Sequence, residues 1–159
     1  MHVKGSSQGG FLEDGTRAGK GRTLCRAVRF RGDVPHDVRH GQHAVTKHEP
    51  ISVIHEWSPA TAQFLSALWS NEILDEVGFA FVRQDTGGRE EVWASLTLTK
   101  ATVAFVELRS GGREFGKLAE LGGEDWRAYQ DVGLHAEKIE FMIKDGSGKV
   151  TATYDRKKS

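Results

Sequence analysis

Residues 91–99 read EVWASLTLT and, after Lys100, residues 101–108 read ATVAFVEL. In the first run an apolar side chain occupies every second position from Val92 to Leu98. This period of two predicts a β-strand with one buried face. The second run either continues the strand after a bend or returns beside it as a neighbour, and the pattern leaves both open.

More strand-like segments flank this stretch. They are residues 23–31, 50–57, 73–83, 134–144 and 149–154. The sequences DTGG at residues 85–88 and DGSG at residues 145–148 predict hairpin turns, because Gly adopts positive φ without steric cost. Residues 32–49 and 110–133 show no clear period and are expected to be long excursions, the second with room for one helical turn.

One helix is expected, over residues 58–72. Ser58 is a favoured N-cap residue, and Pro59 follows at the first helical position, where proline is well tolerated. The apolar stripe expected to face the core consists of Ala62, Phe64, Leu65, Leu68 and Trp69. The fold class is therefore mainly β with one flanking α-helix, arranged as a barrel or a sandwich.

Composition sets limits on the class of protein. The 159 residues suit a single domain spanning 1–159, and 38% hydrophobic residues suffice for a core. Lys+Arg and Asp+Glu both count 22, which gives no support to a polyanion-binding role. No run approaches the roughly 20 apolar residues of a membrane span, and the first residues lack an apolar signal segment. We expect synthesis in the cytoplasm and no stable membrane insertion.

Histidines are the most tempting chemical feature. His36, His40 and His43 could bring imidazoles near one zinc or copper ion, which would suit a small metalloenzyme. The segment is not convincingly helical, and the single Cys25 offers no thiolate site, so packing at a surface or interface is the favoured interpretation.

Other chemistry finds little support. The arginines that could contact nucleic-acid phosphate are Arg22, Arg26, Arg29, Arg31 and Arg39. Aromatic residues between them are few, and pairing between subunits explains them equally well. No nucleophile motif or phosphate loop is present. We therefore expect no enzyme activity, catalytic residue, cofactor, metal site or nucleic-acid partner.

Four collinear stretches resemble one family. They are MHVKGSSQGGF at residues 1–11, KHEPISVIHEW at 47–57, SPATAQFLSALWSNEIL at 58–74 and EVWASLTLTKATVAFV at 91–106. Together they are similar to the Hcp family, the haemolysin-coregulated tube proteins of type VI secretion systems. LHAEKIEFMIK at 134–144 resembles the family's last long strand, whereas residues 110–133 match no pattern. The family's acidic, Trp-containing tail is replaced by YDRKK at 154–158.

The resemblance implies an Hcp-like β-barrel of two packed sheets, one flanking helix and a long extended loop. It implies hexameric rings that stack into a tube, with a contractile sheath, spike and baseplate proteins, and small effectors as partners. Such a protein is cytoplasmic before assembly and is then secreted by the type VI system without a signal peptide. On this interpretation the subunit-interface residues are expected to be Arg29, Arg31, Arg39, His40 and His43.

Two alternatives stay close to the same fold. One is a tube or baseplate component of a phage-tail-like contractile particle, which would share the ring. The other is a monomeric Hcp-like adaptor that carries one effector. The sequence does not separate these from the secretion tube.

Overall fold

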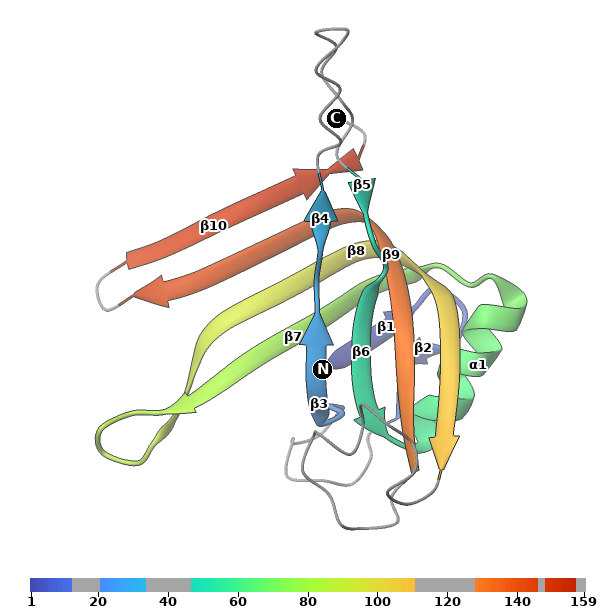
Figure 1. The fold of residues 1–159 in the computed structure, drawn as a ribbon, viewed down its shortest axis with the longest axis horizontal. Coiled ribbons are helices and arrows are strands. Elements are labelled where there is room, and N and C mark those ends of the chain that lie inside the picture. Colours follow the sequence, from blue (N-terminus) through green and yellow to red (C-terminus); the bar gives the residue numbers. More distant parts are fainter. Residues whose placement is uncertain (13–20, 34–46, 111–127, 146–147, 157–159) are drawn as a thin grey trace, which may run out of the picture.

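The computed structural model describes residues 1–12, 21–33, 47–110, 128–145 and 148–156. Strands dominate, as the sequence predicts, and the described residues contain one helix (Figure 1). In chain order the elements are β1 (His2–Gly5), β2 (Gly9–Gly10), β3 (Cys25–Arg29), β4 (Gly32–Asp33), β5 (Lys47–His48), β6 (Ile51–Glu56), α1 (Pro59–Ser70), β7 (Leu74–Gln84), β8 (Glu90–Ser110), β9 (Ala128–Asp145) and β10 (Gly148–Asp155).

Eight strands form one antiparallel sheet. Its order is β2-β1-β7-β8-β9-β6-β3, with β10 paired to the outer half of β9, while β4 and β5 pair separately. The two packed layers expected from the sequence are thus two parts of one curled sheet, with β6 and β9 in front of β1 and β7 (Figure 1). Both layers contribute to the same core, through Val3 and Val77 on one side and Val53 and Val132 on the other.

The alternative left open at residues 101–108 is resolved. β8 runs without interruption from Glu90 to Ser110, through Lys100 at φ 53°. Beyond that point the pairing with β9 shifts between Val103 and Phe105, so that β8 holds one extra residue. The Phe105 ring lies over Gly133, where a Cβ atom would sit 2.1 Å from ring carbon Cε1. Residue 133 must therefore lack a side chain for the Phe105 ring to take this position beside the bulge.

Two segments expected to be irregular contain strands. β9 begins at Ala128, six residues before the strand expected at 134–144, so the end of the 110–133 excursion is a strand. β4 and β5 pair Gly32 with His48 and Asp33 with Lys47 at the base of the 32–49 excursion. In both places backbone pairing forms the strand, although the side chains show no period. No helix among the described residues is long and apolar enough to span a membrane.

The helix lies where it was predicted, but it buries a different stripe. Its buried residues are Ala60, Phe64 and Ala67, whereas Ala62 and Trp69 face outward, Trp69 with 78% of its surface exposed. The small alanines let α1 approach the sheet, and Phe64 inserts between Phe11 and His55. Of the predicted stripe, Phe64 is buried and Leu68 packs partly against the core, but the other fully buried positions are the alanines Ala60 and Ala67.

The ends of the helix follow ordinary capping chemistry. Ser58 is the extended N-cap residue, and its backbone N–H donates to Thr61 Oγ1 at 2.9 Å. The helix ends at Asn71, which adopts the left-handed conformation at φ 52°. The Glu72 N–H then bonds back to the Ala67 carbonyl at 2.9 Å. This places the Glu72 side chain beside the first hairpin of the chain.

A buried carboxylate holds that hairpin. Glu72 is 6% exposed, and its oxygens accept hydrogen bonds from the Ser7 N–H at 2.7 Å, the Gln8 N–H at 2.9 Å and Gln8 Nε2 at 2.7 Å. Burial by itself raises the pKa of Glu72, but the hydrogen bonds from Gln8 and Ser7 outweigh it and leave the pKa below its ordinary 4.5. The turn between β1 and β2 is thus attached to the end of α1.

We expect Glu72→Gln to lower the free energy of unfolding by about 1–3 kcal/mol, because an amide NH₂ facing Gln8 Nε2 sets two donors against each other. The carboxylate's contribution is complete above about pH 4.5 and is lost as pH falls through the lowered native pKa. Urea unfolding across this range measures both effects.

The matched control is Glu76→Gln, since Glu76 is exposed and pairs with His2 at 2.7 Å. Its cost should stay below about 1 kcal/mol. Equal costs for the two variants would contradict the assignment of Glu72 as a structural anchor.

Candidate assembly surface

Four strands run together out of the core as one extension, whose inner residues still belong to the core cluster. It comprises residues 79–84 of β7, 90–99 of β8, 138–145 of β9 and the whole of β10, and we call it the wing. Figure 1 shows these strands running out together, away from α1. The β7–β8 turn at its tip is held by Asp85, whose carboxylate accepts from the Gly87 and Arg89 N–H groups at 2.8 Å.

Both outer strands of the wing present open edges. β1 pairs with β7 only up to Gly78, so among the described residues no strand covers β7 from Phe79 onward. Within the described part of the chain β10 pairs with β9 alone, and its residues from Gly148 to Thr153 are exposed. Val82 at one edge and Val150 at the other are 52% and 71% exposed. Open edges with apolar side chains are sites where another chain adds a strand.

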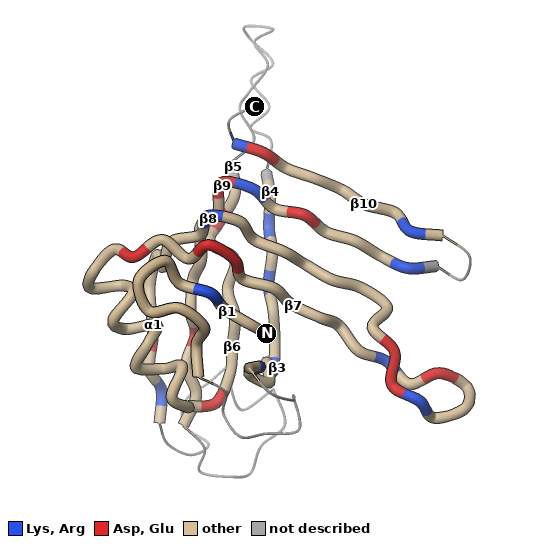
Figure 2. The backbone as a smooth tube through the Cα atoms, turned by 180° about the vertical axis from the view of Figure 1, so that it is seen from behind, with Lys and Arg blue, Asp and Glu red and all other residues tan. Residues whose placement is uncertain are grey.

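Charges avoid the middle of both edges. Residues 77–82 read VGFAFV and residues 150–154 read VTATY, without a charged side chain. Figure 2 shows an uncharged stretch along β10, with charges only near its two ends. Edge strands that stay unpaired usually carry Lys, Pro or other protection along their length. Here Lys149 and Arg83 lie only at the ends of the open stretches, and the uncharged runs between favour pairing with a partner.

The two faces of the wing differ in chemistry. Along one row of the register, Phe81, Ala94, Ile143 and Val150 follow each other across the four strands and continue the core face. On the opposite face the rows carry Thr97, Glu140 and Thr153, or Ser95, Met142 and Thr151. The wing therefore has one apolar side and one mainly polar side.

The base of the 32–49 excursion is a second candidate surface. Glu49 Oε2 lies 3.6 Å from Arg29 Nη2, and Glu49 Oε1 lies 3.6 Å from Arg31 Nη1. The Glu49 N–H donates to the Arg31 carbonyl at 3.1 Å. Both guanidinium groups stay largely exposed, so these ion pairs contribute little to stability and leave the arginines accessible to a partner.

His48 closes the base of that excursion. Its ring stacks on Phe30 at 5.5 Å between centroids and meets Tyr154 edge-on at 4.0 Å. Neither ring nitrogen has a hydrogen-bond partner among the described residues, and desolvation lowers the pKa of His48 below 6.5. Because Gly32 faces this ring, with a Cβ position 2.9 Å from Nδ1, only glycine fits there without a shift. The native state therefore favours neutral His48.

This burial predicts a pH effect on stability. Since the native pKa of His48 lies below the unfolded value, the unfolded chain binds more protons, and stability falls as pH drops from about 6.5. His48→Phe keeps an aromatic ring against Phe30 and Tyr154 but cannot titrate, so its urea midpoint should depend less on pH between about 7.5 and 5. His135→Gln, at an exposed histidine, is the control. An unchanged slope in His48→Phe would contradict the prediction.

The residues expected at an interface fall in two groups. Arg29 and Arg31 meet at Glu49, as described. Arg39, His40 and His43, and also His36, lie outside the described residues. The described residues contain no cluster of three metal-ligating side chains. Cys25 is partly buried against the core, and no disulfide forms in the described chain.

His55 is a core residue and not part of a candidate functional site. It is fully buried, its Nδ1–H donates to the Glu56 carbonyl at 2.8 Å, and Gln130 Nε2 donates to its Nε2. This pattern fixes the neutral tautomer with the proton on Nδ1.

Sequence reasoning missed the wing edges. The uncharged runs at residues 77–82 and 150–154 could have indicated them. Such runs are also typical of inner strands, so they become informative only when the outermost strands of the sheet are known.

Comparison with known proteins identifies the class. Residues 15–142 match the family described as "Type VI secretion system effector, Hcp". The chain thus belongs to the Hcp family of type VI secretion proteins, as its fold and the resemblance in its sequence indicate. No curated protein matches the chain significantly.

Solved structures agree on the fold. A protein described as "Crystal structure of Hcp protein" superposes with a TM-score of 0.79 at 18% identity, covering 97% of this chain and 96% of that chain. Secreted protein Hcp3 from Pseudomonas aeruginosa gives 0.75 at 15% identity, covering 97% and 94%. An Hcp1 mutant from E. coli EAEC 042 gives 0.76 at 15% identity, covering 98% and 95%.

Proposed function

We propose that this protein is the tube subunit of a type VI secretion system, assembling as hexameric rings that stack into a tube. The observation that carries the proposal is the wing, whose two open edges lie on opposite sides of one four-stranded sheet. An edge of one copy that pairs with the other edge of the next makes a heterologous contact, and such contacts close into rings when the rotation allows.

Strand direction supports this pairing. All neighbours within the wing are antiparallel, so β10 and β7 run in opposite directions across its four strands. When copies are related by rotation about a ring axis, β7 of one copy meets β10 of the next in antiparallel order. The antiparallel order of neighbouring strands then continues around the whole ring. An odd number of strands would place parallel neighbours at every junction.

The base of the excursion serves stacking. Arg29 and Arg31 stay exposed around Glu49, next to the segment that holds Arg39, His40 and His43, and these five residues form the proposed contact with a neighbouring subunit or ring. The tube is made in the cytoplasm, surrounded by a contractile sheath with spike and baseplate proteins, and secreted with small effectors inside. The polar face of the wing, with its threonines and Glu140, suits a water-filled channel.

Two edge variants test the ring. Wild-type protein should show a solution mass near six times 17.6 kDa by light scattering over a concentration series. Val82→Arg blocks the β7 edge and Val150→Arg blocks the β10 edge, so either variant alone should be monomeric. Mixed together, they should form a heterodimer and nothing larger, because each supplies one intact edge.

The control is Leu12→Arg, which places the same charge at an exposed apolar residue outside the wing and should leave the ring intact. A full ring from either edge variant would exclude pairing between β7 and β10. A wild-type monomer at every concentration would exclude the ring itself and favour the adaptor alternative.

A further inference from the structure

Helix α1 has an outer face without charge. Residues 57–71 read WSPATAQFLSALWSN, and no acidic or basic side chain occurs among them. Ala62, Ser66 and Trp69 lie on the outward side of the helix, and Trp69 is 78% exposed. A surface helix normally presents charged and polar side chains to water. An exposed tryptophan on an uncharged helix is instead typical of a contact with another protein surface.

The first segment of the chain extends this face. The Leu12 N–H donates to Gln63 Oε1 at 2.7 Å, and Gln8 Nε2 donates to the Gln63 carbonyl at 3.1 Å, so this segment lies against α1. Residues 5–12 read GSSQGGFL, again without charge, and Leu12 is 61% exposed. Ile73, just beyond the helix, is 46% exposed. We call the exposed residues Leu12, Ala62, Ser66, Trp69 and Ile73 the helix patch.

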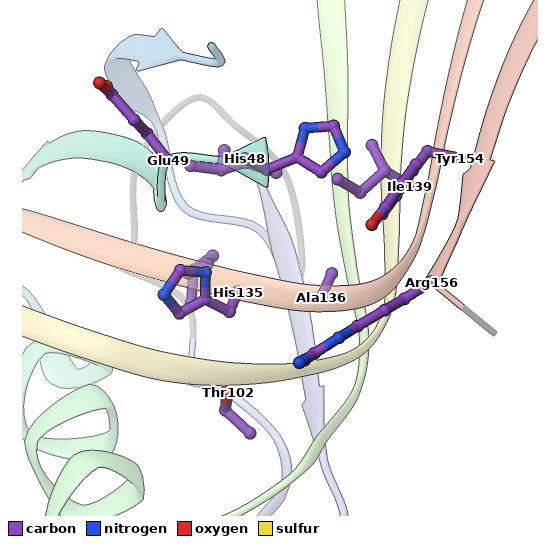
Figure 3. A pocket seen from close by; sticks show the side chains of 10 residues that line it. His48, Glu49, Thr102, His135, Ala136, Ile139, Tyr154 and Arg156 are labelled. Atoms are coloured by element: carbon purple, nitrogen blue, oxygen red, sulfur yellow. The ribbon is translucent and has the colours of Figure 1, made fainter. Parts of the chain in front are cut away.

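A second apolar surface lies on the wing. Figure 3 shows the Tyr154 ring beside His48, with ring centroids 4.0 Å apart, so the base of the 32–49 excursion covers the inner end of β10. On the same face of β10, Ala152 and Val150 lie further out and are exposed, Val150 with 71% of its surface. Ile143, which pairs with Val150, is half-buried. We call Ile143, Val150 and Ala152 the wing patch.

The two patches lie at opposite ends of the molecule. Figure 1 shows α1 at one end of the longest axis and the tips of the wing hairpins at the other. One chain therefore cannot cover its own wing patch with its own helix patch. Two copies placed head to tail along this axis bring the helix patch of one against the wing patch of the next. Neither patch contains a charged residue, so the contact buries no unpaired charge.

We propose that the helix patch of each copy binds the wing patch of a copy in the next ring, and that this contact stacks the rings. The inference rests on the proposed ring and names the surfaces that join one ring to another. The contact is heterologous, because each copy uses a different patch toward each neighbour, so it propagates along the tube without closing.

The same contact should not hold single chains together. A contact made by a few exposed side chains is small and weak for one pair of chains. A ring makes the contact through all its subunits at once, and such multivalent contacts reinforce each other. Rings should therefore stack under conditions in which monomeric variants stay apart.

Stacking is measured by sedimentation velocity and negative-stain electron microscopy, from the concentration at which rings are complete upward. Wild-type rings should form stacks. Trp69→Glu and Ile143→Glu should each give single rings, because a carboxylate in the contact has no partner. Mixed in equal amounts, the two variants should form pairs of rings and nothing longer, since each retains one intact patch.

The matched control is Met142→Glu. Met142 adjoins Ile143 on β9 but lies in the row with Ser95 and Thr151, on the opposite face of the wing. Its rings should stack as wild-type rings do. Circular dichroism spectra matching wild type establish that each variant is folded.

The outcomes separate the contact from the ring. Wild-type rings that never stack, or stacks of Trp69→Glu or Ile143→Glu rings at wild-type concentrations, would overturn the stacking contact and leave the ring standing. Loss of rings in folded Trp69→Glu, or loss of stacking in Met142→Glu, would also overturn it. Wild-type protein without rings would overturn both the contact and the proposed function.

Discussion

The pairing of β8 with β9 is the constraint on which the rest of the structure depends. These two strands hydrogen-bond from Ala94 and Ile143 in the wing to Ser110 and Ala128 at the far end of the core. Strand β7 pairs with β8, β6 and β10 pair with β9, and α1 packs on β8, while β1 and β3 join the sheet through β7 and β6. Core and wing are therefore parts of one sheet, and neither can shift register without the other.

A sheet this long must bend, and the bend is localised. Lys100 adopts positive φ. A few residues further along β8, the bulge between Val103 and Phe105, opposite Gly133, adds one residue to the strand. These backbone irregularities accompany the departure of the wing from the core.

Much of the fold follows from local patterns. The alternation from Val92 to Leu98, the DTGG turn and the Ser58-Pro59 helix start all predict what the structure contains. The predicted stripe of α1 was right for Phe64 and wrong for Ala62 and Trp69, because helical spacing alone does not say which small residues face a sheet. β4, β5 and the start of β9 were missed because backbone pairing with distant strands forms them.

The assembly surface was harder to predict for a related reason. A strand's own sequence shows whether one face is apolar, but its neighbours decide whether it lies at an edge. Val150 reads as a normal strand residue and becomes informative only once β10 is seen to pair on one side. Likewise, the resemblance of the first 108 residues to the Hcp family predicted a ring, whereas it gave no hint of the open edges.

The order of the strands has a consequence for synthesis on the ribosome. β1 pairs with residues 74–78, and β6 pairs with residues 129–134, so each of these strands emerges long before its partner. Contacts of this kind close large loops and make folding slow compared with helical proteins of the same size. The nascent chain would expose apolar strands such as β6 until residues 129–134 have been made, which makes this a sequence whose yield should respond to chaperone supply and elongation rate.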